Sequence, residues 1–242
     1  MVSGFVGNLQ RALRCWRRDP RLPVIVLVIW ALETIPIALS LTTHTVGLGL
    51  LSSVFMLATL GFLGALRVWY LEIEEGRRVP GTEVYVLSRS LWKRFFGLGV
   101  YTVVLMLVPS IAFAAIRSVN EVAGTIALFV LLLVVDVMLT FATVVLSFFE
   151  MTAGEAVRYS WAVTKAQWPA SAPYVIAAPL ALHLTFMVVP AAEMPAAVYL
   201  VISLAIALLA LLCKGATLFF YSDRYFAAAD EPALPSPPPP TT

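Results

Sequence analysis

The sequence predicts an all-α, polytopic membrane protein with six transmembrane helices in three hairpins, each preceded by an amphipathic helix at the cytoplasmic surface. Three observations predict this class. First, 61% of the residues are hydrophobic and 12% are charged, whereas a soluble domain carries about 25% charged residues. Second, the mean hydropathy is +0.92. Third, the apolar residues gather in six segments of the length that a helix needs to cross a bilayer, about 20 residues.

Each of the six segments is bounded by polar, Gly or Pro residues. Helices are the expected structure, because backbone polar groups in lipid must be hydrogen-bonded within the segment. A buried soluble core is excluded, because the rest of the chain is too short to cover six such helices. We expect one domain over 1–228 and a Pro-rich tail without packed structure over 229–242. The predicted spans are 22–41, 46–69, 95–116, 122–148, 172–189 and 195–221.

The first apolar segment is predicted to be a retained span. A cleaved signal peptide has a short basic start and a compact apolar core. Here the basic region is long, and Glu33 and Pro36 interrupt the apolar residues.

Lys and Arg residues fall almost entirely on one side of the predicted spans. Cytoplasmic connections carry an excess of these residues, so both termini and the two longer connections are predicted to be cytoplasmic. The opposite connections are short and hold only Arg117. The cations on the cytoplasmic side are Arg11, Arg14, Arg17, Arg18, Arg21, Arg67, Arg77, Arg78, Arg89, Lys93, Arg94, Arg158, Lys165, Lys214 and Arg224.

Three stretches before the hairpins have the pattern of basic amphipathic helices lying at the headgroup level. They suggest three units of surface helix, span and span, which is either internal duplication or the rhythm of any six-span protein. The patterns are Val6, Leu9, Leu13 and Trp16 against Arg11, Arg14 and Arg18; Val84, Leu87, Leu91 and Phe95 against Arg89 and Lys93; and Ala156, Tyr159 and Val163 against Glu155, Arg158 and Lys165. Predicted contacts with anionic lipids are Arg11, Arg14, Arg17, Arg18, Arg89, Lys93 and Arg94.

Four motifs together resemble a group of six-span bacterial membrane proteins. They are LQRALRCWRRDPRLPVIVLV near the start, LEIEEGRRVPGTEV, FFEMTAGEAVRYSWAVTKAQW, and YSDRY at the end of the last span. The group includes the membrane domain found beside some glycerophosphoryl diester phosphodiesterases and stand-alone members of unknown function. In YSDRY, Arg224 directly follows Asp223, which departs from the spacing of the group. The resemblance implies the six-helix fold and a bacterial inner-membrane location, and it implies no phosphodiesterase activity because the soluble catalytic domain is missing.

Asp136 lies inside the apolar run LLLVVDVMLTF of the fourth predicted span. An ionisable residue near mid-bilayer costs about 2.5–3.5 kcal/mol on insertion scales and usually faces the interior of the bundle. Thr140 and Thr143 share its helix face. This polar stripe is therefore predicted to turn inward.

Lys214 is the predicted partner of Asp136, although its long side chain could instead snorkel to the cytoplasmic interface. Glu33 lies at a depth similar to that of Asp136, and His183 lies in the fifth span. These groups form a hydrogen-bonded architectural cluster, an ion or proton path, or a ligand site in which His183 holds a pigment or haem. The predicted cluster is Asp136, Lys214, Glu33, His183, Thr140 and Thr143.

Catalytic and metal-binding motifs are not visible in the sequence. The two cysteines, Cys15 and Cys213, belong to no metal-binding spacing, and a net charge of +2 does not suggest a nucleic-acid partner. We therefore expect no catalytic residue, cofactor or metal. The acidic residues Glu72, Glu74 and Glu75 are interpreted as a solvated charge run, with a lipid-modifying enzyme as the minor alternative.

The function expected from these observations is that of a non-enzymatic membrane protein. It would be an accessory or scaffold subunit, or a factor in envelope or lipid homeostasis, and would act through contacts with anionic lipids or other membrane proteins. The alternative is a small transporter or ion-coupled permease component that uses the Asp136-centred cluster.

Overall fold

The computed structural model describes residues 2–43, 46–177, 180 and 195–226. All regular structure within these ranges is helical. The elements are α1 (Val2–Arg18), α2 (Arg21–Thr43), α3 (Val46–Glu74), α4 (Gly81–Val119), α5 (Glu121–Phe148), α6 (Ala153–Ala166) and α8 (Ala196–Tyr225).

Three stretches of these helices are long and apolar enough to cross a membrane, namely Ser53–Glu74, Val122–Phe148 and Ala197–Tyr225. Several helices also expose large apolar side chains, among them Val103 and Ile111 of α4 and Val130 of α5. Contiguous exposed apolar surface is characteristic of a site that contacts lipid or another protein. The chain is therefore a helical membrane protein. Part of the predicted fifth span, including His183, lies outside the described residues.

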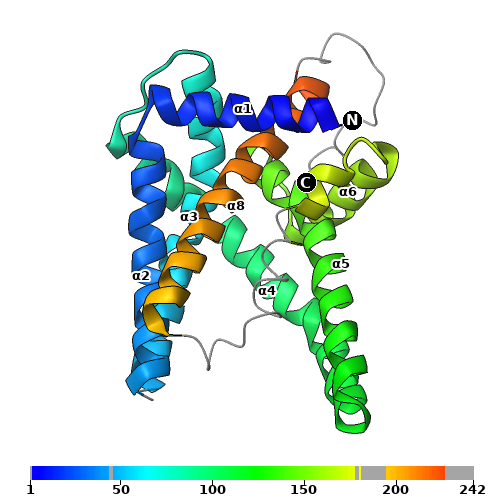
Figure 1. Ribbon diagram of the computed structural model, residues 1–242. Helices are drawn as coiled ribbons and strands as arrows, with labels where there is room; N and C mark the ends of the chain where they lie inside the picture. The colour runs from blue at the N-terminus through cyan, green and yellow to red at the C-terminus, as the bar shows by residue number, and fades with distance from the viewer. Residues whose placement is uncertain (1, 44–45, 178–179, 181–194, 227–242) are drawn as a thin grey trace.

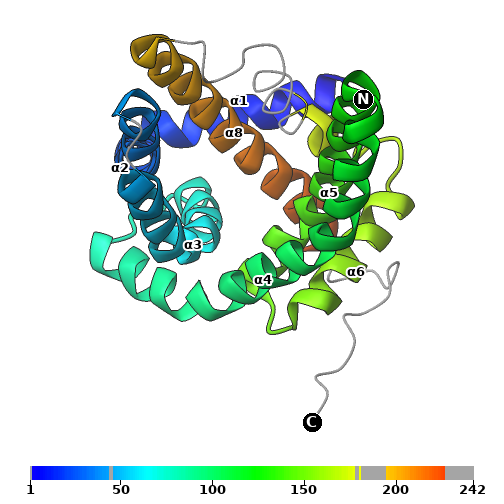
Figure 2. The same ribbon diagram turned by 90° about the horizontal axis from the view of Figure 1, so that it is seen from below.

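The long helices form two groups that diverge from a common end (Figure 1). The first group contains α2, α3 and α8, and the second contains α4 and α5; α3 packs on α4 and joins the groups. Viewed along the helices, they make a ring that α8 crosses obliquely (Figure 2). Across the common end lie α1, which packs mainly on α8, and α6, which packs mainly on α5.

Local sequence explains where the short helices begin and end. The Asp19-Pro20 pair separates α1 from α2, since proline disfavours the helical conformation of the residue before it. The first turn of α6 carries a capping box, in which Thr152 and Glu155 each satisfy the other's backbone N–H. This arrangement, led by the hydrogen bond from the Thr152 backbone, holds the pKa of Glu155 below its usual range.

The stretch before the third predicted span differs from the expectation in one respect. Instead of a separate surface helix, Gly81–Val119 is one continuous helix of 39 residues. No proline interrupts the chain between Gly81 and Leu107, so nothing forces a break at the membrane surface. Its inward face matches the prediction, because Val84, Leu91 and Phe95 are buried while Arg89 and Lys93 are exposed.

Helix α3 approaches α4 closely because it presents glycine there. A Cβ added at Gly61 would collide with the Ser88 backbone carbonyl, and one added at Gly64 would lie 2.6 Å from the Phe95 ring. Small residues allow such close packing between membrane helices. The Gly61 and Gly64 positions therefore fix the distance between the two helix groups.

Candidate functional site

The end of the molecule that carries α1 is held together by buried polar side chains. The Asp19 carboxylate accepts hydrogen bonds from the Arg21 guanidinium at 2.8 and 2.6 Å and from the Trp69 indole at 3.2 Å. The same guanidinium donates to the Val79 carbonyl at 3.0 Å. Hydrogen bonding from Arg21 keeps the pKa of Asp19 below its usual range. One carboxylate thus joins α1, α2, α3 and the connection to α4.

A second set of contacts joins α1 to the last described helix. The Arg11 guanidinium lies 2.7 Å from a Glu74 oxygen of α3 and 2.6 Å from an Asp223 oxygen of α8. It also stacks 4.5 Å from the centre of the Phe219 ring. Trp16 donates to the Tyr70 hydroxyl at 2.6 Å, and this hydroxyl donates to the Leu211 carbonyl.

Residues of the four sequence motifs therefore have architectural roles at this end. Asp19, Glu74 and Asp223 form ion pairs. Ala156 and Ser160 are fully buried where α6 packs on α5, and the Ser160 hydroxyl accepts the Phe141 N–H at 3.1 Å. The motif residues thus contribute contacts between helices at this end.

The predicted lipid-contacting cations divide into two sets. Arg11 is held by carboxylates, and Arg94 lies 2.5 Å from a Glu150 oxygen, so these two side chains serve the fold and are not available to lipid. Arg18 is exposed and donates to the Glu74 carbonyl. The predicted lipid-contacting cations that are exposed and make no hydrogen bond or ion pair within the described part of the chain are Arg14, Arg17, Arg89 and Lys93.

Apolar side chains on α1 point in two directions. Leu9 and Trp16 pack on the core, together with a face of Phe5, Ala12 and Cys15 that the sequence pattern did not reveal. Val6 and Leu13 are 43% and 38% exposed. They remain available to a membrane surface beside the free cations.

Two of the acidic residues at the end of α3, Glu72 and Glu74, form ion pairs. Glu74 binds Arg11, and Glu72 forms an ion pair with Arg77. Glu72 and Glu74 are thus partly buried and ion-paired, which differs from the solvated charge run expected from the sequence, and Glu75 is exposed.

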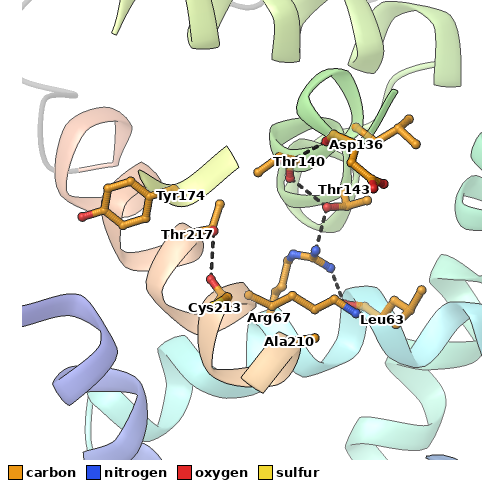
Figure 3. Close-up of a pocket in the computed structure, with 11 residues that line it drawn as sticks. Leu63, Arg67, Asp136, Thr140, Thr143, Tyr174, Ala210, Cys213 and Thr217 are labelled. Atoms are coloured by element: carbon orange, nitrogen blue, oxygen red, sulfur yellow. Dashed lines mark hydrogen bonds between the residues drawn. The ribbon is translucent and has the colours of Figure 1, made fainter. Parts of the chain in front are cut away.

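The interior site is a cavity of about 320 Å³ between α3, α5 and α8 (Figure 3). Its charged lining residues are Arg67, Asp136 and Lys214, and its hydroxyl-bearing ones include Thr140 and Thr143. The remainder of the wall is mainly apolar. Asp136 and Lys214, the predicted pair, thus line one cavity.

A chain of hydrogen bonds follows the predicted polar stripe of α5 (Figure 3). Thr140 donates to the Asp136 carbonyl at 2.7 Å, and Thr143 donates to the Thr140 carbonyl at 2.9 Å. The Thr143 oxygen then accepts from Arg67 at 2.6 Å. Because the Thr143 proton is committed to its own helix, its oxygen is oriented to receive the guanidinium.

Glu33 lies in an adjoining cavity of about 200 Å³ between α2, α3 and α8. Thr59 donates to its carboxylate at 2.5 Å. Lys214 lines this second cavity as well. It therefore lies between the cavity that contains Glu33 and the cavity that contains Asp136. Five members of the predicted cluster line these two adjoining spaces, and His183 lies outside the described residues.

Arg67 lines the cavity but was not among the residues predicted for this site. The charge pattern places Arg67 with the cytoplasmic connection, although its position lies within the predicted span 46–69. Helix α3 continues to Glu74, and Arg67 is only 4% exposed. The available signal was its spacing from Gly64 and Tyr70, three residues away on either side, which places it on the inward part of the helix.

Within the described ranges, no group of three or more His, Cys, Asp or Glu side chains is arranged to hold a metal ion. Both cysteines are buried and free, and burial raises the pKa of the Cys15 thiol to about 11. Comparisons with protein-family models, with curated proteins and with solved structures find no match for this chain.

Proposed function

We propose that this chain is a non-enzymatic integral membrane protein that acts through contacts with anionic lipids and with other membrane proteins. It has six spans in three hairpins, with both termini cytoplasmic, and resides in a bacterial inner membrane as an accessory subunit or a factor in lipid homeostasis. Kinship with the six-span group belongs to the same proposal, supported by the architectural roles of the shared motifs.

One observation carries this proposal. At the common end of the helices, Arg14 and Arg17 of α1 and Arg89 and Lys93 of α4 are exposed and have no partner in the described part of the chain. On the same helices, Arg11 and Arg94 form ion pairs with carboxylates. The four exposed cations make no such pair, so the contacts that hold the fold together do not require them. Each basic residue near an anionic leaflet is worth about 1 kcal/mol, and exposed Val6 and Leu13 add apolar contact.

Lipid analysis of the protein extracted in native membrane discs tests the proposal. Wild-type discs are expected to be enriched in anionic lipid relative to the whole membrane. Replacing Arg14, Arg17, Arg89 and Lys93 by Gln is expected to reduce this enrichment several-fold. The matched control replaces the three arginines by Lys and retains the charge. Equal enrichment in the Gln variant and the wild type, or purification as a lipid-free monomer without partners, contradicts the proposal.

A second candidate function is that of a small transporter or ion-coupled permease component. Lys214 supports it, because this side chain lines both the cavity that contains Asp136 and the cavity that contains Glu33. Adjacent intramembrane ionisable groups are typical of proton and ion paths. Proteoliposomes provide the assay: flux in the wild type that Asp136→Asn abolishes supports this candidate. Absence of flux, or flux that the substitution leaves unchanged, removes it.

A further inference from the structure

Arg67 is a buried cation whose hydrogen-bond acceptors are neutral groups. Its guanidinium donates to the Leu63 carbonyl at 2.5 Å and to the Thr143 hydroxyl at 2.6 Å. None of the ion pairs found among the described residues includes it. Buried charges in proteins are normally paired, because an isolated one is costly to desolvate. The charge on Arg67 therefore calls for an anion.

The guanidinium also has donors to spare. A guanidinium carries five N–H groups, and two hydrogen bonds from Arg67 are made within the described chain. Its Nε is buried and has no hydrogen-bond partner. Nε and an adjacent Nη together form the fork that binds the two oxygens of a carboxylate or phosphate.

The cavity beside Arg67 is large enough for more than water. Its volume of about 320 Å³ corresponds to roughly ten water molecules at about 30 Å³ each, and it falls within the range of small-ligand sites. Two cations, Arg67 and Lys214, face it against one carboxylate, Asp136. Glu33 faces the adjoining cavity and accepts from Thr59. Arg67 and Lys214 thus line a mainly apolar space that contains one carboxylate, Asp136.

We propose that this cavity binds one oxyanion group of the phosphate class, with Arg67 as its forked partner and Lys214 as a second cation. Thr143 is a positioning residue, because its oxygen holds the guanidinium in place. The group is carried either by an anionic phospholipid whose acyl chains leave between the helices, or by a free phosphate. This inference goes beyond the proposed function, since it uses interior residues and none of the exposed cations of α1 and α4.

The experiment uses the full chain, delipidated in a neutral detergent. Native mass spectrometry with phosphatidylglycerol counts retained lipids, and thermal unfolding with inorganic phosphate detects the free anion. The variants are Arg67→Gln, Arg67→Lys and Thr143→Val. Arg14→Gln is the matched control, because it removes an equal charge from an exposed position. Size-exclusion chromatography establishes that each variant is folded.

We expect one ligand to bind the wild type and the Arg14→Gln control equally. Arg67→Gln is expected to weaken binding at least roughly tenfold, as loss of a charged hydrogen-bond partner does. Arg67→Lys should retain part of this binding, because lysine keeps the positive charge but lacks the planar, forked guanidinium. Stabilisation by inorganic phosphate identifies a free anion, whereas retention of one phosphatidylglycerol without any response to phosphate identifies a lipid headgroup.

Two results would overturn the inference. One is a wild-type protein that binds neither probe, and the other is binding that Arg67→Gln and Thr143→Val leave unchanged. If Arg67→Gln does not fold, Thr143→Val decides the question alone, because it removes the oxygen that holds Arg67 and leaves every charge in place. Loss of surface lipid enrichment with intact binding in the cavity would refute the proposed function and not this inference.

Discussion

Asp19 shows how much one side chain can organise. Its carboxylate is buried between α1 and α2 and accepts donors from Arg21 and from Trp69 of α3. Arg21 in turn reaches the Val79 carbonyl and lies over the Trp69 ring. The Asp19 carboxylate thus contacts α2 and α3 directly, and it contacts the connection to α4 through Arg21.

We expect Asp19→Asn to lower the free energy of unfolding by about 1–3 kcal/mol, the usual value for hydrogen bonds that involve a charged group. The loss should depend on pH. Because the pKa of Asp19 is depressed in the folded protein, its stabilising contribution is fully present above the ordinary Asp pKa of about 3.9 and is lost as the pH falls from there through the lower pKa of the folded state. Thermal unfolding of the two proteins in detergent across this pH range measures the difference.

The exposed Glu83→Gln provides the control, since Glu83 lies at the exposed start of α4. It should lower the free energy of unfolding by less than about 1 kcal/mol, the usual upper value for an acidic side chain at an exposed helix N-terminus. A stability difference between wild type and Asp19→Asn that stays constant at acid pH would show that the charge of Asp19 is not what stabilises the corner.

Arg67 marks the limit of sequence reasoning at the same scale. The positive-inside rule treats a cation near a span end as a loop residue, and the sequence alone does not reveal that α3 continues past Trp69. Asp136, Thr140 and Thr143 were easier to place, because four- and three-residue spacing puts them on one helix face. For Lys214 the sequence left two positions open, beside Asp136 or at the cytoplasmic interface, and it did not predict Arg67 as the second cation of the cavity.

At the scale of elements, the contact between α3 and α4 depends on missing side chains. Gly61 lies against the Ser88 backbone, and Gly64 lies against Leu91 and Phe95. Backbone atoms cannot move aside as the end of a flexible side chain can. The two glycines therefore determine how closely the two helix groups meet.

Gly61→Ala is expected to destabilise the protein by more than 1 kcal/mol, because overpacking of a close contact costs typically 1–3 kcal/mol. Gly97→Ala is the matched control within α4, since a Cβ there meets nothing within 4 Å. It should be neutral or stabilising by up to about 1 kcal/mol, the helix preference of Ala over Gly. Chemical unfolding of both variants measures the contrast, and equal effects would refute the close contact.

Helix α4 shows which element features the sequence could predict. The spacing of Val84, Leu91 and Phe95 correctly identified the buried face. The structure shows no break between the predicted surface helix and the predicted span, because an amphipathic pattern and an apolar one can follow each other along one helix without any change in backbone geometry. Element type was thus predictable, and the number of separate helices was not.

At the scale of the whole molecule, the pairing of Arg11 with Asp223 constrains how the chain is threaded. Residues 11 and 223 lie at the same end of the helices because their side chains are 2.6 Å apart. The proposed six spans would place both positions on one side of the membrane, because each crossing changes side.

Fusions to green fluorescent protein test this topology. The reporter becomes fluorescent in the bacterial cytoplasm and stays dark after export through the general secretion pathway. We expect fusions at the N-terminus and at the C-terminus both to fluoresce. A fusion placed in the predicted outer connection at 117–121 is the control and should remain dark. Fluorescence at one terminus alone would contradict the shared sidedness of residues 11 and 223.

The same ion pair has a consequence for biosynthesis. Arg11 is made first and Asp223 is made 212 positions later, so the contact between α1 and α8 cannot form until α8 has been synthesised. During synthesis α1 can pack on α3 through Glu74 and Tyr70, but its Ala12 face has no α8 to pack against. The N-terminal helix is therefore expected to reach its final packing only after α8 has been added.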